Sequence, residues 1–190
     1  MRWPPTFRDL PVLETPRLRL RRFGPGDAAA VFNLVSDLAV AKWTARIPHP
    51  YERAMTDEWL RDTDRRMADG NGIAFAIETR AAGELIGSAG LDFETAPGLA
   101  EIGYYLGRAH WGRGFMSEAA EALLRFGFET LNLAAVRGEV MPDNAASLSV
   151  LDKMGFDRLG RDEVDAPARG GRIPVEVRLL TADTWRERNG

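Results

Sequence analysis

The residues best suited to chemistry form one continuous segment, His110-Trp111-Gly112-Arg113-Gly114-Phe115-Met116-Ser117-Glu118-Ala119. Glycine allows the backbone to turn sharply and to approach a ligand closely. The segment runs into a stretch with helical spacing of apolar residues, and the start of a helix presents unpaired amide groups at the positive end of its dipole. The pattern therefore predicts a binding site for a phosphate group. Taken alone, it is as typical of a turn that only joins a strand to a helix.

Other chemistries lack the residues that they need. The segment is not a Gly-x-x-x-x-Gly-Lys-Ser/Thr loop or a dinucleotide fingerprint, which disfavours a nucleotide-binding regulator that uses it for ATP. The chain has no cysteine, so no cysteine acyl-enzyme can form. Its two histidines, His49 and His110, are isolated from carboxylates at metal-ligand spacing. We therefore expect no metal cofactor.

Composition points to one domain without a polyanionic partner. The chain has 190 residues, of which 45% are hydrophobic and 28% charged. Its 25 Lys and Arg against 28 Asp and Glu give a net charge of -3, which argues against nucleic acid as a partner. The N-terminus lacks an apolar signal core, and no window approaches the length of a membrane span. We expect a cytoplasmic protein with no membrane partner.

The elements that position the segment follow from the hydrophobic pattern. Residues 1–13, rich in proline, are expected to form an extended leader, residues 14–183 a single domain and residues 184–190 a tail. Asp27 is expected to cap the first helix, Asn144 a later one. Periodicity predicts helices over 28–38, 53–68, 115–131 and 145–154. It predicts strands over 17–23, 73–79, 85–93, 99–106, 134–141, 156–163 and 173–180.

Three motifs in order along the chain resemble one known family. They are Glu101-Ile102-Gly103-Tyr104, the glycine-containing segment, and Asn144-x-x-Ser147 followed by Lys153-Met154-Gly155-Phe156. Together they resemble the GNAT superfamily of acetyl-CoA-dependent N-acetyltransferases, over about residues 14–182. The opening Glu14-Thr15-Pro16-Arg17-Leu18-Arg19-Leu20-Arg21 is similar to that of the ribosomal-protein N-terminal alanine/serine acetyltransferases. The resemblance implies an α/β GNAT fold, with a mixed, mostly antiparallel central sheet of about seven strands flanked by helices. We expect a monomer or a homodimer, a choice that the sequence leaves open.

The resemblance also implies where acetyl-CoA, the co-substrate, binds. Backbone amides of residues 112–117 would cradle the pyrophosphate, and the strands ending near Leu106 and starting at Ala134 would separate to admit pantetheine. The implied cofactor-binding residues are Leu106, Gly112, Arg113, Gly114, Phe115, Met116, Ser117 and Asn144. Trp111 and Met116 depart from the family loop at its two ends, which backbone binding tolerates.

Catalytic roles are assigned partly from chemistry and partly from the resemblance. Glu101 is proposed to accept the amine proton, through water, or else to be a solvent-facing strand carboxylate. Many relatives have a tyrosine that protonates the leaving thiolate where this chain has Leu151, and the resemblance suggests Ser147 instead. Trp43 and Tyr104 are expected near the substrate, although Trp43 is equally suited to packing.

These observations predict an enzyme that moves an acetyl group directly to a primary amine. The acceptor is a protein N-terminal α-amine or a small-molecule amine such as a polyamine, an antibiotic or an amino acid. Leu151 leaves a third alternative, a non-catalytic acyl-CoA-binding sensor, which would bind CoA without turnover.

Overall fold

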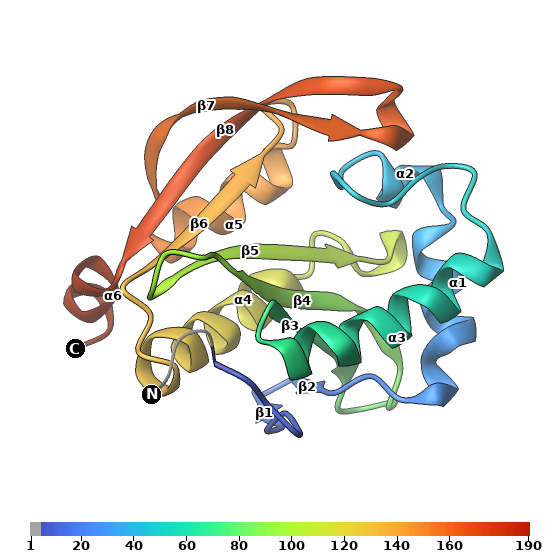
Figure 1. Cartoon of the computed structure of the whole chain (residues 1–190), viewed down its shortest axis with the longest axis horizontal. Helices are drawn as coiled ribbons and strands as arrows, with labels where there is room; N and C mark the ends of the chain where they lie inside the picture. Colours follow the sequence, from blue (N-terminus) through green and yellow to red (C-terminus); the bar gives the residue numbers. More distant parts are fainter. Residues whose placement is uncertain (1–4) are drawn as a thin grey trace.

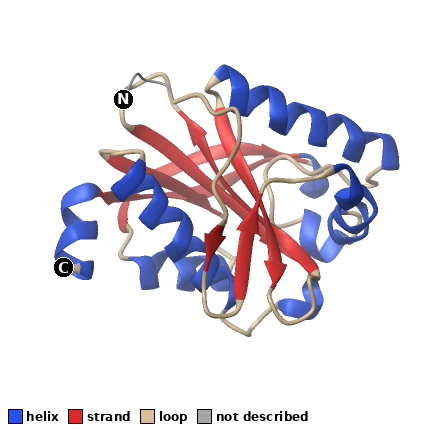
Figure 2. Cartoon of the chain, turned by 90° about the horizontal axis from the view of Figure 1, so that it is seen from below, coloured by secondary structure: helices blue, strands red, loops and turns tan. Residues whose placement is uncertain are grey.

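A computed structural model of the chain describes residues 5–190, which form an eight-stranded sheet flanked by helices on both faces (Figures 1 and 2). The strand order is β1-β2-β3-β4-β5-β6-β8-β7, and every neighbouring pair is antiparallel except β5 and β6. The strands are β1 (Leu13–Glu14), β2 (Leu18–Arg21), β3 (Gly72–Thr79), β4 (Leu85–Phe93), β5 (Leu99–Leu106), β6 (Ala135–Val140), β7 (Asp157–Ala166) and β8 (Gly171–Thr181). The helices are α1 (Ala28–Val35), α2 (Leu38–Ala41), α3 (Arg53–Asp69), α4 (Phe115–Arg125), α5 (Ala145–Met154) and α6 (Ala182–Asn189).

The predicted α/β fold with a mixed, mostly antiparallel sheet is confirmed, with eight strands where about seven were expected. The additional strand is the two-residue β1, which is too short for a period-two pattern to reveal. The predicted helix over 115–131 continues past α4 as a π-helical turn, Phe126–Thr130. The expected helix ends are present at Gly70 and Gly155, which both adopt left-handed backbone conformations with φ of 74° and 87°.

The predicted cap at Asp27 is wrong. A 3-10 turn over Pro25–Asp27 gives Asp27 helical backbone angles, and its side chain does not cap α1. The carboxylate instead accepts hydrogen bonds from the Gly24 amide at 2.7 Å and from Arg21 at 2.7 and 2.9 Å. A cap of the expected kind occurs one helix later, where Asp37 accepts a hydrogen bond from the Ala39 amide at the start of α2.

Within residues 5–190, parts of the expected leader and tail contact the core. Residues 1–4 of the expected leader lie outside the described residues. Within the rest of it, Leu10 is buried, and the Phe7 amide donates a hydrogen bond to the Met67 carbonyl. Most of the expected tail belongs to α6, where the buried Trp185 stacks on Phe128 with ring centroids 5.4 Å apart.

The helices form two layers around the sheet. Helices α1 and α3 pack on one face with a small apolar cluster that includes Ala76. Helices α4 and α5 pack on the other face over the main core, to which β3 contributes Phe75 and Ile77. Alternate residues of β3 thus face opposite layers, as the period of a strand requires. None of the helices within residues 5–190 is long and apolar enough to cross a membrane.

The sheet divides where its one parallel pair comes apart. β5 and β6 are paired from Leu99 with Ala135 to Ile102 with Gly138, and both strands continue beyond that point without pairing to each other. Each is held by its other neighbour, because β4 pairs with β5 up to Leu106 and β8 pairs with β6 up to Val140. The separation that the family resemblance implied is therefore present.

Replacing Trp185 tests whether α6 is part of the core. We expect Trp185→Ala to lower the free energy of unfolding by about 3 to 5 kcal/mol, because it empties a buried aromatic site. Leu159→Ala is the matched control, since Leu159 is 63% exposed, and it should change stability by less than about 0.5 kcal/mol. Urea denaturation of both variants measures the difference, and equal stabilities would contradict the packing role of α6.

Candidate active site

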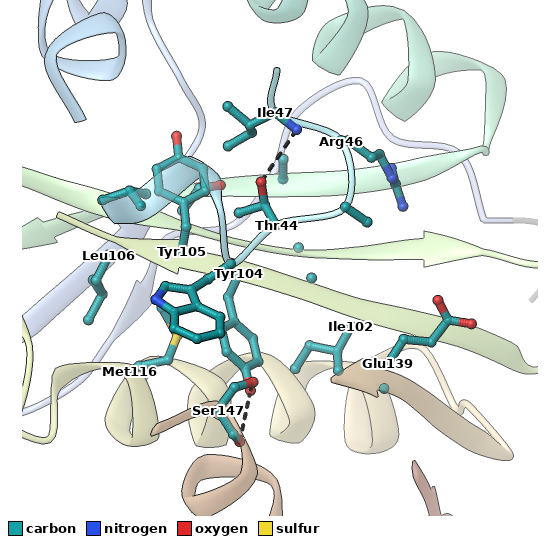
Figure 3. Close-up of a pocket in the computed structure, with 18 of the residues that line it drawn as sticks. Thr44, Arg46, Ile47, Ile102, Tyr104, Tyr105, Leu106, Met116, Glu139 and Ser147 are labelled. Atoms are coloured by element: carbon teal, nitrogen blue, oxygen red, sulfur yellow. Dashed lines mark hydrogen bonds between the residues drawn. The ribbon is translucent and has the colours of Figure 1, made fainter. Parts of the chain in front are cut away.

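A cavity of about 990 Å³ opens between the two halves of the sheet (Figure 3). It is lined from β5 and β6, from the start of α4, from α5 and from the segment between α2 and α3. The predicted residues that line it are Trp43, Glu101, Tyr104, Leu106, Gly112, Gly114, Phe115, Met116, Ser117, Asn144 and Ser147. Arg113 is not among them. Its guanidinium carbon lies 4.8 Å from the centroid of the Phe115 ring.

The loop before α4 leaves the start of that helix open. Gly112 and Gly114 have φ of 70° and 75°, in the left-handed region where glycine is favoured. Gly114 is the N-cap, and no side chain of the described residues caps the helix there. The side chains of Phe115 and Met116 are buried, so the backbone amides of these residues are the polar groups that they offer to a ligand. The first amides of α4 are thus available to an anion such as a diphosphate.

An ion pair between distant parts of the chain holds this loop in place. Arg17 Nε donates to Glu118 Oε2 at 2.6 Å, and Arg17 Nη1 donates to the Arg113 carbonyl at 2.9 Å. Thr15 and the Arg17 amide donate to the other oxygen of Glu118, at 2.6 and 2.8 Å. Burial raises the pKa of Glu118, but these hydrogen bonds outweigh it and the pKa lies below its ordinary value. These contacts give Thr15 and Arg17 of the Glu-Thr-x-Arg motif a structural role, because they hold the glycine-containing loop against the turn between β1 and β2.

The backbone groups along the unpaired edge of β5 face the cavity. The Gly107 amide donates to the Ile86 carbonyl on β4, so alternation along the strand directs the main-chain groups of Leu106 and Tyr104 away from β4. Beyond Ile102 no strand pairs with that side. Trp111 Nε1 donates to the Leu106 carbonyl at 2.8 Å, which leaves the Leu106 amide as a donor toward the cavity. Such an edge is suited to an extended ligand that pairs as an added strand would.

Tyr104 on β5 and Ser147 on α5 form a hydrogen-bonded pair beside the cavity. Asn144 caps α5 by accepting a hydrogen bond from the Ser147 amide at 3.1 Å, which leaves its Nδ2 as a donor. The Ser147 and Tyr104 hydroxyls are 2.9 Å apart, and Figure 3 shows the two side chains meeting below the cavity. Burial raises the pKa of Tyr104 to about 12, against the smaller lowering effect of the Ser147 hydrogen bond. Tyr104 is therefore a protonated donor at neutral pH.

A group of charges closes the far end of the cavity. Glu101 Oε2 accepts a hydrogen bond from Arg137 Nη2 at 2.9 Å, and Glu101 Oε1 lies 3.9 Å from Arg46. Arg137 Nη2 also lies 3.1 Å from Glu139 Oε1. Figure 3 places Glu139 and Arg46 on the same side of the cavity, away from the Ser147–Tyr104 pair. The two ends of the cavity thus offer different chemistry, hydroxyl donors at one and carboxylates at the other.

Trp43 packs against the core, which is one of the two roles expected for it, and its contact with substrate stays a prediction. It lines the cavity and also packs against a small buried cluster that includes Met141 and Val175. The Arg169 guanidinium lies 5.5 Å from its ring centroid and forms an ion pair with Asp143 at 2.8 Å. Trp43 therefore connects the segment after α2 to the β7–β8 hairpin above the cavity.

Several residues of the site could not be identified from the sequence. Arg17 and Glu118 are separated by 101 residues, and only folding brings them together. Glu139 and Arg137 alternate with buried residues on β6, which is also the pattern of a half-exposed strand. Trp111 stood out as a departure from the family loop, but nothing in the sequence indicated its hydrogen bond to Leu106.

Comparisons with known proteins agree with this geometry. Residues 17–157 match the model of a family described as an acetyltransferase (GNAT) domain. The chain is 33% identical over 164 residues to the uncharacterized N-acetyltransferase p20 of Bacillus licheniformis, across 86% of this chain and 92% of that protein. The ribosomal-protein-S5-alanine acetyltransferase of Vibrio fischeri superposes with a TM-score of 0.78 at 18% identity, over 92% of this chain and 98% of its own. RimL, a ribosomal L7/L12 α-N-protein acetyltransferase solved with coenzyme A, gives 0.80 at 19% identity, over 92% and 99%. The similarity to these two structures is evidence for the fold of this chain.

The tyrosines give a test of the site that needs no ligand. Burial raises the pKa of all three, Tyr51, Tyr104 and Tyr105, and that of Tyr104 reaches about 12. We expect no phenol of the folded protein to ionise with a midpoint at or below pH 10. Absorbance at 295 nm measures this, and the protein in guanidinium chloride should titrate near pH 10 as the control.

The same shifts determine how stability depends on pH. Because each folded pKa lies above its unfolded value, the stabilising effect is complete below about pH 10 and is lost as the pH rises toward 12. Thermal unfolding between pH 9 and 12 should therefore show a falling midpoint. A constant midpoint across that range would contradict the burial of these phenols.

Proposed function

We propose that this chain, which belongs to the GNAT family of acetyl-CoA-dependent N-acetyltransferases, acetylates the α-amine at the N-terminus of a peptide or protein. The observation that carries the transferase assignment is the separation of β5 and β6 beside the open start of α4. It provides one continuous cavity in which an extended thioester and an amine can meet.

The residues present fit acetyl-CoA, which supplies an acetyl group activated as a thioester. The amides from Gly112 to Ser117 are proposed to bind the diphosphate, and the backbone of β5 to bind pantetheine. The Leu106 amide and Asn144 Nδ2 are the donors available along that path. Because these contacts come from the backbone and from one capping residue, the departures at Trp111 and Met116 do not remove them.

Ser147 is proposed to donate a hydrogen bond to the leaving sulfur. Many relatives use a tyrosine for this role, and Leu151, which stands at that position here, has no group to donate. The Tyr104 hydroxyl lies 2.9 Å from the Ser147 hydroxyl and fixes its position. Full proton transfer from Tyr104 to a thiolate is unfavourable, because a phenol pKa of about 12 exceeds the ordinary thiol pKa of about 8.5. The difference corresponds to a factor of more than about 10³, so we assign Tyr104 a donor and positioning role.

An α-amine acceptor is favoured by chemistry and by the sequence. Its pKa near 8 makes the neutral fraction at pH 7 roughly 300-fold larger than that of a lysine with a pKa of 10.4. The first-strand phrase of the chain resembles that of the ribosomal-protein N-terminal acetyltransferases. The residues that follow the N-terminus are proposed to lie along the segment between α2 and α3, which lines the cavity.

Calorimetric titration of acetyl-CoA, run beside a thiol-release assay, tests the proposal. The acceptor panel contains peptides with N-terminal alanine or serine, the same peptides blocked at the N-terminus, polyamines and amino acids. We expect acetyl-CoA binding and release with the unblocked peptides only. Release with a polyamine or an amino acid would identify a small-molecule acetyltransferase, and binding without any release would favour the acyl-CoA sensor.

Gly112 provides a matched pair of variants for the diphosphate site. A Cβ at this position meets no atom within 4 Å, and both Asn and Asp tolerate the left-handed backbone better than other side chains. We expect Gly112→Asp to weaken acetyl-CoA binding by about tenfold or more relative to Gly112→Asn, because only Asp places a negative charge beside the diphosphate. Equal affinities of the two variants, measured by calorimetry, would contradict the loop assignment.

Tyr104 and Tyr105 provide a second matched pair. Tyr104→Phe removes the hydroxyl that fixes Ser147, and we expect kcat to fall by about tenfold while the affinity for acetyl-CoA is retained. Tyr105→Phe should leave kcat unchanged, because the Tyr105 hydroxyl is buried without a hydrogen-bond partner in residues 5–190. Steady-state kinetics of both variants distinguish the roles, and equal kcat values would show that the Tyr104–Ser147 bond is only structural.

A further inference from the structure

Trp111 joins the two parts of the proposed acetyl-CoA site, the edge of β5 and the loop before α4. It follows the one-turn 3-10 helix Arg108–His110 and directly precedes Gly112. Its indole Nε1 donates a hydrogen bond to the Leu106 carbonyl at 2.8 Å. Trp111 lines the cavity and is 41% exposed, a large exposure for a tryptophan. This hydrogen bond ties the end of β5 to the loop.

The indole leaves Leu106 with only a donor to offer to the cavity. The Gly107 amide donates to the Ile86 carbonyl at 2.9 Å, and the Tyr105 carbonyl faces β4. The Leu106 carbonyl accepts from Trp111. Two peptide units flank the Leu106 side chain, and the fourth of their polar groups is the Leu106 amide, which faces away from β4.

Tyr104 offers the cavity both a donor and an acceptor. It lies two residues before Leu106 on β5, so its backbone amide and carbonyl also face away from β4. Within residues 5–190, no side chain donates a hydrogen bond to the Tyr104 carbonyl. The unpaired edge of β5 therefore has unlike positions, with a donor alone at Leu106 and a donor beside an acceptor at Tyr104.

This difference restricts how an extended ligand can pair with the edge. An added strand bonds through carbonyl groups and N–H groups in alternation. In one register, a ligand carbonyl accepts from the Leu106 amide while a ligand N–H donates to the Tyr104 carbonyl. In the register shifted by two residues toward α4, that N–H meets the Leu106 carbonyl.

Trp111 blocks the shifted register. The Leu106 carbonyl points away from β4, so an indole nitrogen 2.8 Å from it stands on the side from which a ligand N–H would approach. A ligand N–H placed there has no acceptor, and a polar group without a partner in a cavity is unfavourable. The protein thus accepts the ligand in one of two neighbouring registers.

We propose that Trp111 is a positioning residue that sets the register of the pantetheine arm on β5, by keeping the Leu106 carbonyl from the ligand. The inference rests on the proposed function, since acetyl-CoA is the ligand of that reaction. The register decides how far the thioester reaches along β5, and so whether its sulfur comes to the Ser147 hydroxyl. Trp111 touches no reacting atom and acts through Leu106.

This role differs in its kinetics from a simple anchor of the loop. An anchor, when removed, loosens the site, so affinity and turnover fall together. Loss of the indole N–H instead frees the Leu106 carbonyl and adds a second bound register, in which the thioester is misplaced. Acetyl-CoA then binds at least as tightly, while a smaller fraction of the bound molecules can react.

The first arm of the test uses Trp111→Phe and Trp111→His. Phe keeps an aromatic ring without an N–H, and His has a ring N–H that can reach the same carbonyl. We expect Trp111→Phe to lower kcat by about fivefold or more and to lower KM and the calorimetric Kd for acetyl-CoA by a similar factor. Its kcat/KM for acetyl-CoA, at saturating peptide, should stay within about twofold of the wild type. Trp111→His should return kcat and Kd toward the wild type.

Other patterns contradict the assignment. Weaker binding of acetyl-CoA by Trp111→Phe with a lower kcat/KM would identify an anchor of the loop. An unchanged kcat would show that the register does not depend on Trp111. Equal behaviour of the Phe and His variants would show that the N–H is not the cause.

The second arm observes the hydrogen bond itself and needs no turnover. The chain has five tryptophans, and the Trp111 indole resonance is assigned by its loss in Trp111→Phe. With ¹⁵N and ¹³C labels, a coupling through the hydrogen bond joins Trp111 Nε1 to the Leu106 carbonyl carbon. We expect this coupling in the free protein and also at saturation with acetyl-CoA. Its disappearance at saturation would mean that the ligand takes the carbonyl, which would overturn the proposal.

The outcomes separate this inference from the function on which it rests. A wild type that binds acetyl-CoA and acetylates the peptide, beside a Trp111→Phe variant without the expected kinetics, would remove the inference alone. A wild type that does not bind acetyl-CoA would remove the function, and the inference with it. Urea denaturation with wild-type midpoints confirms that both variants are folded.

Discussion

The parallel pairing of β5 and β6 ends after four residue pairs, and the site depends on that ending. Each strand is secured on its outer side by an antiparallel neighbour, so the two can separate without loss of either. The backbone groups left free on β5 become the floor of the cavity. The helix that follows this strand then begins at the mouth of the opening, where its first amides face the same space.

A second constraint is the ion pair between Arg17 and Glu118. Glycines give the loop before α4 its shape but little rigidity, because glycine has the greatest backbone freedom. Hydrogen bonds from Arg17, which lies between β1 and β2, to Glu118 and to the Arg113 carbonyl hold the loop in place. The proposed anion site therefore combines a glycine-containing loop with contacts from Arg17 that fix the loop. The amides at the start of α4 are thus oriented before a ligand binds.

Much of the fold could be predicted from the sequence. The features that could not be predicted have one physical reason in common. Helices and strands of ordinary length, and the ends at Gly70 and Gly155, follow from local periodicity and backbone preference. The failures concern side-chain partners that local periodicity does not specify. Asp27 bonds to Arg21, six residues earlier, instead of capping a helix, and Trp185 packs on Phe128, which is distant in the sequence. The Glu101–Arg137–Glu139 group likewise exists only because β6 is inserted beside β5.

The order of the last strands has a consequence for synthesis on the ribosome. β8 lies between β6 and β7, so the edge of β6 that faces away from β5 has no partner until β8 has emerged. Trp185, which completes the core beside Phe128, emerges later still. A nascent chain of this protein therefore presents an open strand edge until β8 has been synthesised and an unfilled apolar site until α6 has followed, and such surfaces are prone to aggregation.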